Sequence, residues 1–182
     1  MKYSGEEIKH RLLLEFKNIK FKKSLLDDVN YIAVLSAEEV TLSGENGERF
    51  LQVFNLVKND RKKTIIFLGT KLHNLNLEKF LKREVYLCKI VILGSRSDST
   101  TKIQIKQLSS FLGKHRVINK ILIVSNTYHF PRIKRYCRMY LNSKVRTYYI
   151  GIGDIRFQTQ RVDDEIEKII KYASKKDLPL LI

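Results

Sequence analysis

The chain has 182 residues, 43% of them hydrophobic, a length and composition that suit one domain with its own core. Its two prolines and eight glycines leave little material for a flexible linker, and neither disorder nor a repeat array is expected. The formal net charge of +16 favours anionic partners, but the basic residues are spread from Lys9 to Lys176 and are typical of solvated faces.

No segment has the features of a membrane anchor or a metal site. The longest apolar run near the N-terminus, residues 12–14, falls far short of the roughly 18 residues that cross a bilayer. Cys88 and Cys137 form no CxxC pair, so buried free thiols are expected. We therefore expect a cytoplasmic protein without bound metal, since the histidines are also scattered, at positions 10, 73, 115 and 129.

Residues 1–29 are expected to form an N-terminal helical extension. Apolar side chains recur in steps of three and four across residues 6–21, which is typical of one helical face. Such a face could pack on its own domain, pair with a second copy or lie on a membrane surface. Packing on the domain is favoured because the face is narrow.

From residue 30 to residue 182 the chain alternates between strand and helix patterns. Helical patterns are expected near residues 48–58, 75–82, 101–112, 131–141 and 162–174. Nearly unbroken apolar runs are typical of strands buried on both faces of a parallel sheet. The pattern predicts a three-layer, doubly wound α/β domain with a mostly parallel five-stranded sheet, whose strands are residues 31–35, 64–68, 89–93, 121–124 and 145–150.

In such a sheet, ligands bind beyond the carboxyl ends of the strands, near the point where the strand order reverses. Four of the five segments that follow the predicted strands contain Ser or Thr, and three contain Gly. Small residues allow backbone N–H groups to approach a ligand, although turns and helix caps use the same residues. The set as a whole predicts a ligand site at this edge.

One stretch carries a family resemblance. Residues 121–132 (ILIVSNTYHFPR) consist of an apolar strand, a Ser and a Thr, and then His-Phe-Pro-Arg. This segment resembles the strand–loop–helix signature of the SanA/ElyC/YdcF family of bacterial proteins, with Ser125, His129, Pro131 and Arg132 at matching positions. Residues 97–100 (SDST) resemble the family's Ser-x-Asn-Thr motif, and Arg49 matches an Arg that opens a helix. The resemblance covers roughly residues 30–151.

The resemblance implies a Rossmann-like domain in a family linked to cell-envelope biogenesis, with one branch that binds S-adenosylmethionine. This chain departs from the family at several positions. Ser36 and Ala37 stand where the family has Gly-Gly, and Thr70 stands in the family's Ser-Gly-Gly segment. Gly94 replaces a Glu and Ser99 replaces an Asn, so an acid–base role of that Glu has no counterpart at Gly94.

The predicted site residues suit an anionic ligand. Arg132 offers a planar fork of donors for phosphate or carboxylate, and His129 can donate a hydrogen bond or carry a proton. A structural loop histidine and an arginine in a salt bridge are the alternatives. If both side chains lie in an open cleft, replacing either with Ala costs at most ~0.5 kcal/mol of stability. The predicted ligand-binding residues are Ser36, Arg49, Gly69, Thr70, Ser97, Thr100, Ser125, His129 and Arg132.

Two functional hypotheses follow. The first is binding of a small anionic ligand (a nucleotide, S-adenosylmethionine or a phosphorylated sugar), with or without catalysis. The second is a non-catalytic binding or scaffold protein that uses its basic surface on nucleic acid or anionic lipid. The chain contains no GxGxxG, Walker or GxSxG motif, so no catalytic residue is assigned.

Overall fold

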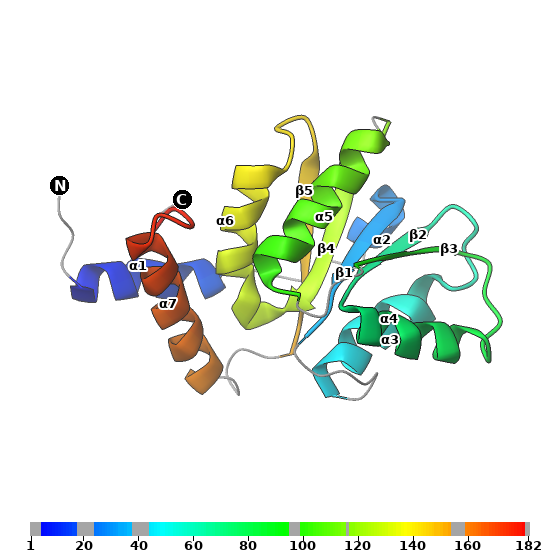
Figure 1. The fold of residues 1–182 in the computed structure, drawn as a ribbon, viewed down its shortest axis with the longest axis horizontal. Helices are drawn as coiled ribbons and strands as arrows, with labels where there is room; N and C mark the ends of the chain where they lie inside the picture. The colour runs from blue at the N-terminus through cyan, green and yellow to red at the C-terminus, as the bar shows by residue number, and fades with distance from the viewer. Residues whose placement is uncertain are drawn as a thin grey trace.

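A computed structural model describes residues 5–17, 24–37, 44–94, 99–115, 117–153 and 159–180. Its centre is a five-stranded sheet in which every strand is parallel to its neighbours, in the order β3-β2-β1-β4-β5 (Figure 1). This Rossmann-like α/β architecture confirms the predicted fold class. The strands are β1 (Tyr31–Leu35), β2 (Thr64–Leu68), β3 (Lys89–Leu93), β4 (Lys120–Asn126) and β5 (Arg146–Ile152).

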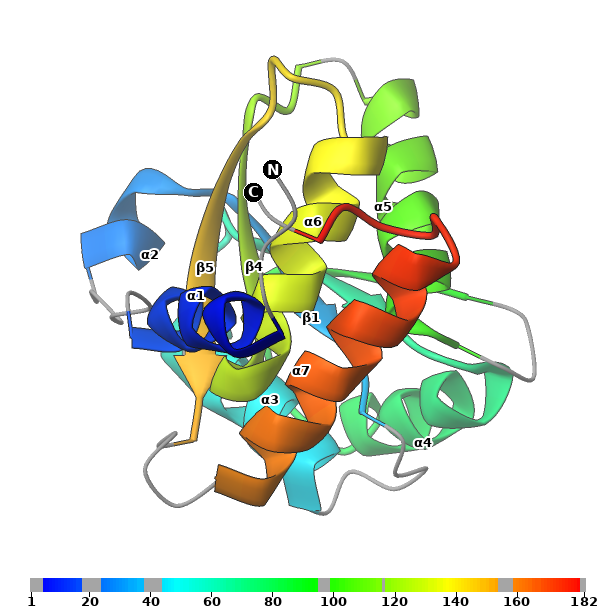
Figure 2. The same ribbon diagram turned by 90° about the vertical axis from the view of Figure 1, so that its left-hand side faces the viewer.

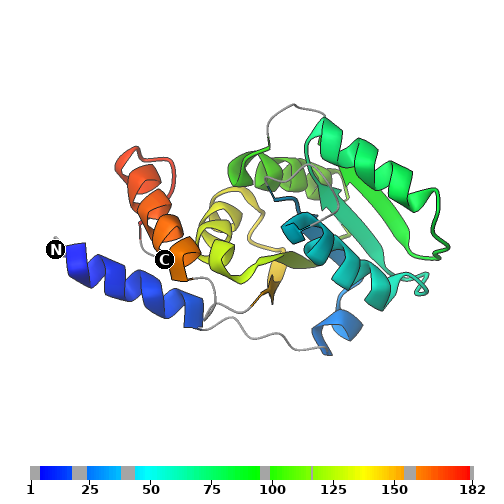
Figure 3. The same cartoon turned by 90° about the horizontal axis from the view of Figure 1, so that it is seen from below.

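Helices cover both faces of the sheet. Helices α3 and α4 lie on one face, and α5 and α6 lie on the other (Figures 1 and 3). The short 3-10 turn η1 (Thr127–His129) leads from β4 directly into α6. The α-helices are α1 (Gly5–Lys17), α2 (Ser24–Asp28), α3 (Gly44–Val57), α4 (Lys71–Leu81), α5 (Thr101–Lys114), α6 (Phe130–Tyr140) and α7 (Thr159–Ser174).

Each central strand contributes to two cores. In β1, Ala33 and Leu35 pack with residues of α5 and α6, whereas Ile32 and Val34 pack with residues of α3 and α4. Because successive side chains of a strand point to opposite faces, a strand covered on both sides must be apolar at every position. This requirement explains the unbroken apolar runs in the sequence.

The observed elements differ from the predicted ones mainly at their ends. Strand β4 continues through Ser125 and Asn126, which the sequence places in a loop, because Ser125 pairs with Gly151 in the β4–β5 ladder. Helix α4 begins four residues earlier than its apolar pattern, because Thr70 caps its N-terminus. The short helix α2 has too few residues for a periodic pattern and was not predicted.

The N-terminal helix α1 packs against α6 and α7 (Figure 2). Leu12 and Phe16 of α1 belong to the core on the α5 and α6 side of the sheet. Arg135 of α6 is fully buried and binds both carboxylate oxygens of Glu15, at 2.6 and 2.8 Å. Such bidentate pairs fix geometry strongly, so α1 is held to the domain at a defined place.

Candidate functional site

A cavity of about 350 Å³ lies at the carboxyl ends of β1 and β4. These two strands are neighbours, yet β1 leads outward through β2 to β3, and β4 leads outward to β5. The strand order therefore reverses between them, which is where open α/β sheets form their ligand crevice. Residues at the strand ends and in α3, α5, α6 and α7 contribute to its lining. The described lining includes Leu35, Ser36, Arg49, Ser99, Thr100, Gln104, Ser125, Tyr128, His129, Arg132, Ile133, Arg161, Asp164, Glu165, Lys168 and Tyr172.

Arg49 spans this switch point. Its Nε donates to Asn126 Oδ1 at 2.5 Å and its Nη1 donates to the Leu35 carbonyl at 3.0 Å. The two acceptors lie at the ends of β4 and β1, so one guanidinium joins both strands to α3. Arg49 is only 1% exposed, so its charge is held permanently beneath the cavity.

Helix α5 supplies neutral polar groups to the opposite wall. Thr100 caps the helix, accepting a hydrogen bond from Ile103 N at 3.3 Å. Gln104 donates from Nε2 to the Ser36 hydroxyl at 3.0 Å and to the Ser36 carbonyl at 3.3 Å. This contact holds the residue after β1 in place. The N-terminal turn of α5 thus borders the cavity, and helix N-termini favour anions.

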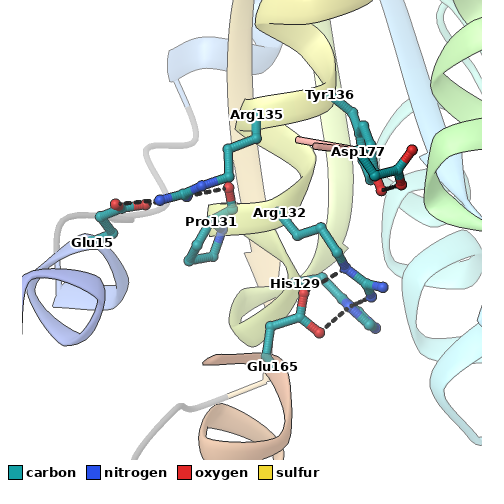
Figure 4. A network of polar contacts seen from close by, with 8 residues as sticks. All are labelled: Glu15, His129, Pro131, Arg132, Arg135, Tyr136, Glu165 and Asp177. Carbon is teal, nitrogen blue, oxygen red and sulfur yellow. Dashed lines mark hydrogen bonds and ion pairs between the residues drawn. The ribbon is translucent and has the colours of Figure 1, made fainter. Parts of the chain in front are cut away.

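His129, Arg132 and Glu165 all line the cavity. Their side chains lie together where α6 meets α7 (Figure 4). Glu165 Oε1 contacts Arg132 Nε at 2.6 Å, and Glu165 Oε2 lies 3.4 Å from His129 Nδ1. Arg132 Nη2 also donates to His129 Nδ1, at 3.0 Å. The expected spacing of three residues does bring His129 and Arg132 together, and α7 adds a carboxylate to the pair.

Burial lowers the pKa of His129 below its ordinary value of 6.5, and the nearby charges of Arg49 and Arg132 lower it further. The carboxylate of Glu165 opposes this effect without reversing it. The imidazole is therefore neutral near pH 7, with Nδ1 accepting from Arg132. In that tautomer the other ring nitrogen, Nε2, carries the proton and can donate a hydrogen bond.

This arrangement differs from the open cleft that the sequence predicts for His129 and Arg132. Arg132 is 8% exposed and Glu165 is 1% exposed, so both ends of their ion pair are buried. Removing one member would leave the other charge buried without its partner, which is costly. The open cleft on which a cost of at most ~0.5 kcal/mol depends is therefore not met at Arg132, and we expect Arg132→Ala to cost more.

Comparison with known proteins found no match. No protein-family model, no curated protein and no solved structure matches this chain.

The structure brings most predicted site residues together. Ser36, Arg49, Thr100, Ser125, His129 and Arg132 all line the cavity. Gly69 and Thr70 do not appear in its lining; they follow β2, one strand away from the switch point. Thr70 caps α4 in a reciprocal pair with His73, and Gly69 packs tightly against His73 and Phe67. Ser97 lies outside the described residues.

Helix α7 brings the residues that the sequence interpretation missed. Arg161, Asp164, Glu165, Lys168 and Tyr172 all line the cavity. One signal was available for Glu165. It lies beside Val162, Ile166 and Ile169 on the apolar face of α7, where a carboxylate is buried and needs a partner. The choice of Arg132 as that partner depends on how α7 packs.

A second polar cluster holds the segment that follows the C-terminal end of α7 (Figure 4). Asp177 binds Lys102 of α5 and accepts from the Tyr136 hydroxyl of α6 at 3.0 Å. The hydrogen bond from Lys102 lowers the pKa of Asp177. Arg135 donates to the carbonyls of Pro179 and Leu180, at 2.9 and 2.6 Å. These contacts tie the segment after α7 to α5 and α6.

Among the described residues, the lining of the cavity holds more positive than negative groups. The described lining contains the cations Arg49, Arg132, Arg161 and Lys168 and the carboxylates Asp164 and Glu165, a formal excess of two positive charges. Within the described ranges, no cluster of three or more His, Cys, Asp and Glu side chains could hold a metal ion. No helix of the same ranges is long and apolar enough to cross a membrane.

Proposed function

We propose that this chain is a cytoplasmic, SanA/ElyC/YdcF-like domain that binds a small anionic ligand at the carboxyl edge of its sheet. The observation that carries the proposal is the cavity at the β1–β4 switch point, whose described lining residues include more cationic than acidic side chains. Its volume of about 350 Å³ lies within the range of small-molecule sites, roughly 300–1,000 Å³.

Two cations support anion binding most directly. Arg132 uses Nε and Nη2 for Glu165 and His129, and its Nη1 makes no hydrogen bond to a described residue. Lys168 lines the cavity and takes part in no ion pair or hydrogen bond within the described ranges. A ligand phosphate or carboxylate would accept hydrogen bonds from both groups, and charge-assisted hydrogen bonds of this kind are strong.

The rival hypothesis is a protein that uses its basic surface on nucleic acid or anionic lipid. The net charge of +16 supports it. Binding of that kind depends on many spread charges and falls steeply with added salt. A cavity ligand, in contrast, should depend on a few particular side chains.

Two lysines of α7 offer a matched test. Lys168 lines the cavity, whereas Lys171, one turn further along, is exposed and does not. Each alanine variant removes one positive charge from the same helix. We expect thermal-shift screening with nucleotides, sugar phosphates and S-adenosylmethionine to identify a ligand, because bound ligand raises the melting temperature. Calorimetry should then show affinity reduced about tenfold or more in Lys168→Ala and unchanged in Lys171→Ala.

Equal losses in both variants, together with steep salt dependence and binding to DNA or anionic vesicles, would support the rival hypothesis. If no anionic probe binds the wild-type protein, the proposal is wrong.

A further inference from the structure

We propose that the ligand of this cavity is a phosphorylated sugar or related polyol monophosphate, rather than a nucleotide or S-adenosylmethionine. The inference rests on the proposed function and narrows it to one class of ligand. Three properties of the described lining support it. Its tyrosine rings are largely covered, several of its hydrogen-bonding groups have no described partner, and its charge suits one phosphate.

The two tyrosine rings of the described lining are largely covered, which leaves little surface for a nucleobase. Tyr128 is 3% exposed; the imidazole of His129 lies 4.2 Å from its ring, centroid to centroid, and the guanidinium of Arg161 lies 5.9 Å from the ring centroid. Tyr172 packs against the hydrophobic core. Leu35 and Ile133 are almost fully buried. Recognition of a base relies on stacking against such surfaces, so a base would gain little here.

Three hydroxyl or amide groups of the lining have no hydrogen-bond partner among the described residues. The Ser99 hydroxyl is buried and makes no hydrogen bond to a described residue. The Ser125 hydroxyl and Gln104 Oε1 likewise have no described partner, since the bonds of Gln104 use only Nε2. Each sugar hydroxyl both donates and accepts, and a polyol can satisfy such neighbouring groups together.

The charge of the lining suits one phosphate. The four cations exceed the two carboxylates by two charges, with His129 neutral. A phosphate monoester carries about −1.5 to −2 charges at pH 7. A diphosphate or triphosphate would add negative charge beside Asp164 and Glu165, whereas the hydroxyls of a sugar can donate to these carboxylates.

Calorimetry with defined probes tests the inference. The probes are glucose 6-phosphate, ribose 5-phosphate, glycerol 3-phosphate, AMP, S-adenosylmethionine and inorganic phosphate. We expect at least one sugar or polyol phosphate to bind about tenfold more tightly than inorganic phosphate and AMP. Ser125→Ala should weaken that ligand about threefold to tenfold, as for one lost hydrogen bond, and leave inorganic phosphate unchanged. Ser174→Ala, which removes an exposed hydroxyl on α7, is the matched control.

The outcomes separate this inference from the proposed function. Tighter binding of AMP, lost in Lys168→Ala, would overturn the sugar assignment and uphold anion binding. Tighter binding of S-adenosylmethionine would overturn the sugar assignment. Equal binding of all phosphates including inorganic phosphate would overturn the sugar assignment and uphold anion binding, and so would a Ser125→Ala variant with unchanged sugar-phosphate affinity. If no probe binds at all, the proposed function fails and the inference fails with it.

Discussion

Glu165 of α7 and Arg132 of α6 form a buried ion pair, with Glu165 Oε1 2.6 Å from Arg132 Nε, in the wall of the cavity. The same carboxylate lies beside His129. Glu165 thus orients Arg132 and His129, while its own negative charge opposes anion binding. One residue therefore both positions Arg132 and His129 and repels an anionic ligand.

This dual role predicts opposite effects of Glu165→Gln on stability and on binding. The neutral amide removes the buried ion pair, so the free energy of unfolding should fall by ~1–3 kcal/mol. Affinity for an anionic ligand should rise, because a negative charge is lost beside Arg132. Urea unfolding and calorimetry measure the two effects. Asp164→Asn is the control: Asp164 is partly exposed, so stability should change by at most ~0.5 kcal/mol. Weaker binding in Glu165→Gln would contradict the prediction.

Arg135 should be among the most important residues for stability. It is fully buried and holds Glu15 together with the carbonyls of Pro131, Pro179 and Leu180. We expect Arg135→Ala to cost ~3–5 kcal/mol, because the substitution leaves a carboxylate and several carbonyls without their donor. Arg138→Ala, at an exposed position one turn further along α6, should cost at most ~0.5 kcal/mol. Similar denaturation midpoints for the two variants would refute this role.

The lowered pKa of His129 predicts a loss of stability in mild acid. Unfolded histidine titrates near pH 6.5, and the folded protein binds this proton only at lower pH. As the pH falls below about 6.5, the unfolded chain therefore gains protons first and becomes more favourable, until the pH reaches the lowered folded pKa. The lowered pKa of Asp177 acts only in stronger acid, below about pH 5.

Melting temperatures measured between about pH 5 and pH 8 test this effect. His129→Gln should show a weaker decline below about pH 6.5 than the wild-type protein. His10→Gln, on the exposed side of α1, should keep the wild-type profile. Identical profiles for all three proteins would mean that His129 is not the group responsible.

Two glycines should respond in opposite ways to alanine. A Cβ at Gly69 would lie 2.8 Å from His73 Cβ and from Phe67 Cε1, so close that neighbouring atoms would have to shift. Gly69→Ala should therefore lower the melting temperature through overpacking of ~1–3 kcal/mol. Gly113 lies in α5, and nothing stands within 4 Å of an added Cβ. Gly113→Ala should stabilise the protein slightly, because alanine favours a helix. Calorimetric melting curves of both variants measure these two changes in melting temperature.

The amino-acid sequence was sufficient to predict the sheet. The runs that became β1, β2 and β3 were predicted at their observed residues, because strands buried on both faces must be apolar throughout. Local chemistry also predicted that His129 and Arg132 lie together, since residues three apart at a helix start share a face. The switch-point rule placed Ser36 and Ser125 at one edge before their contacts were known.

Only the tertiary structure determined which of these residues share a cavity, which are buried and which partners they bind. Gly69 and Thr70 carry the same sequence signal as Ser36, but β2 lies one strand away from the reversal, and Thr70 serves to cap α4. The burial of Arg132 and the partnership of Glu165 with His129 arise when α7 packs against η1 and α6. Periodicity specifies which face of a helix is apolar, but the residue that a buried carboxylate meets depends on contacts between segments distant in the chain.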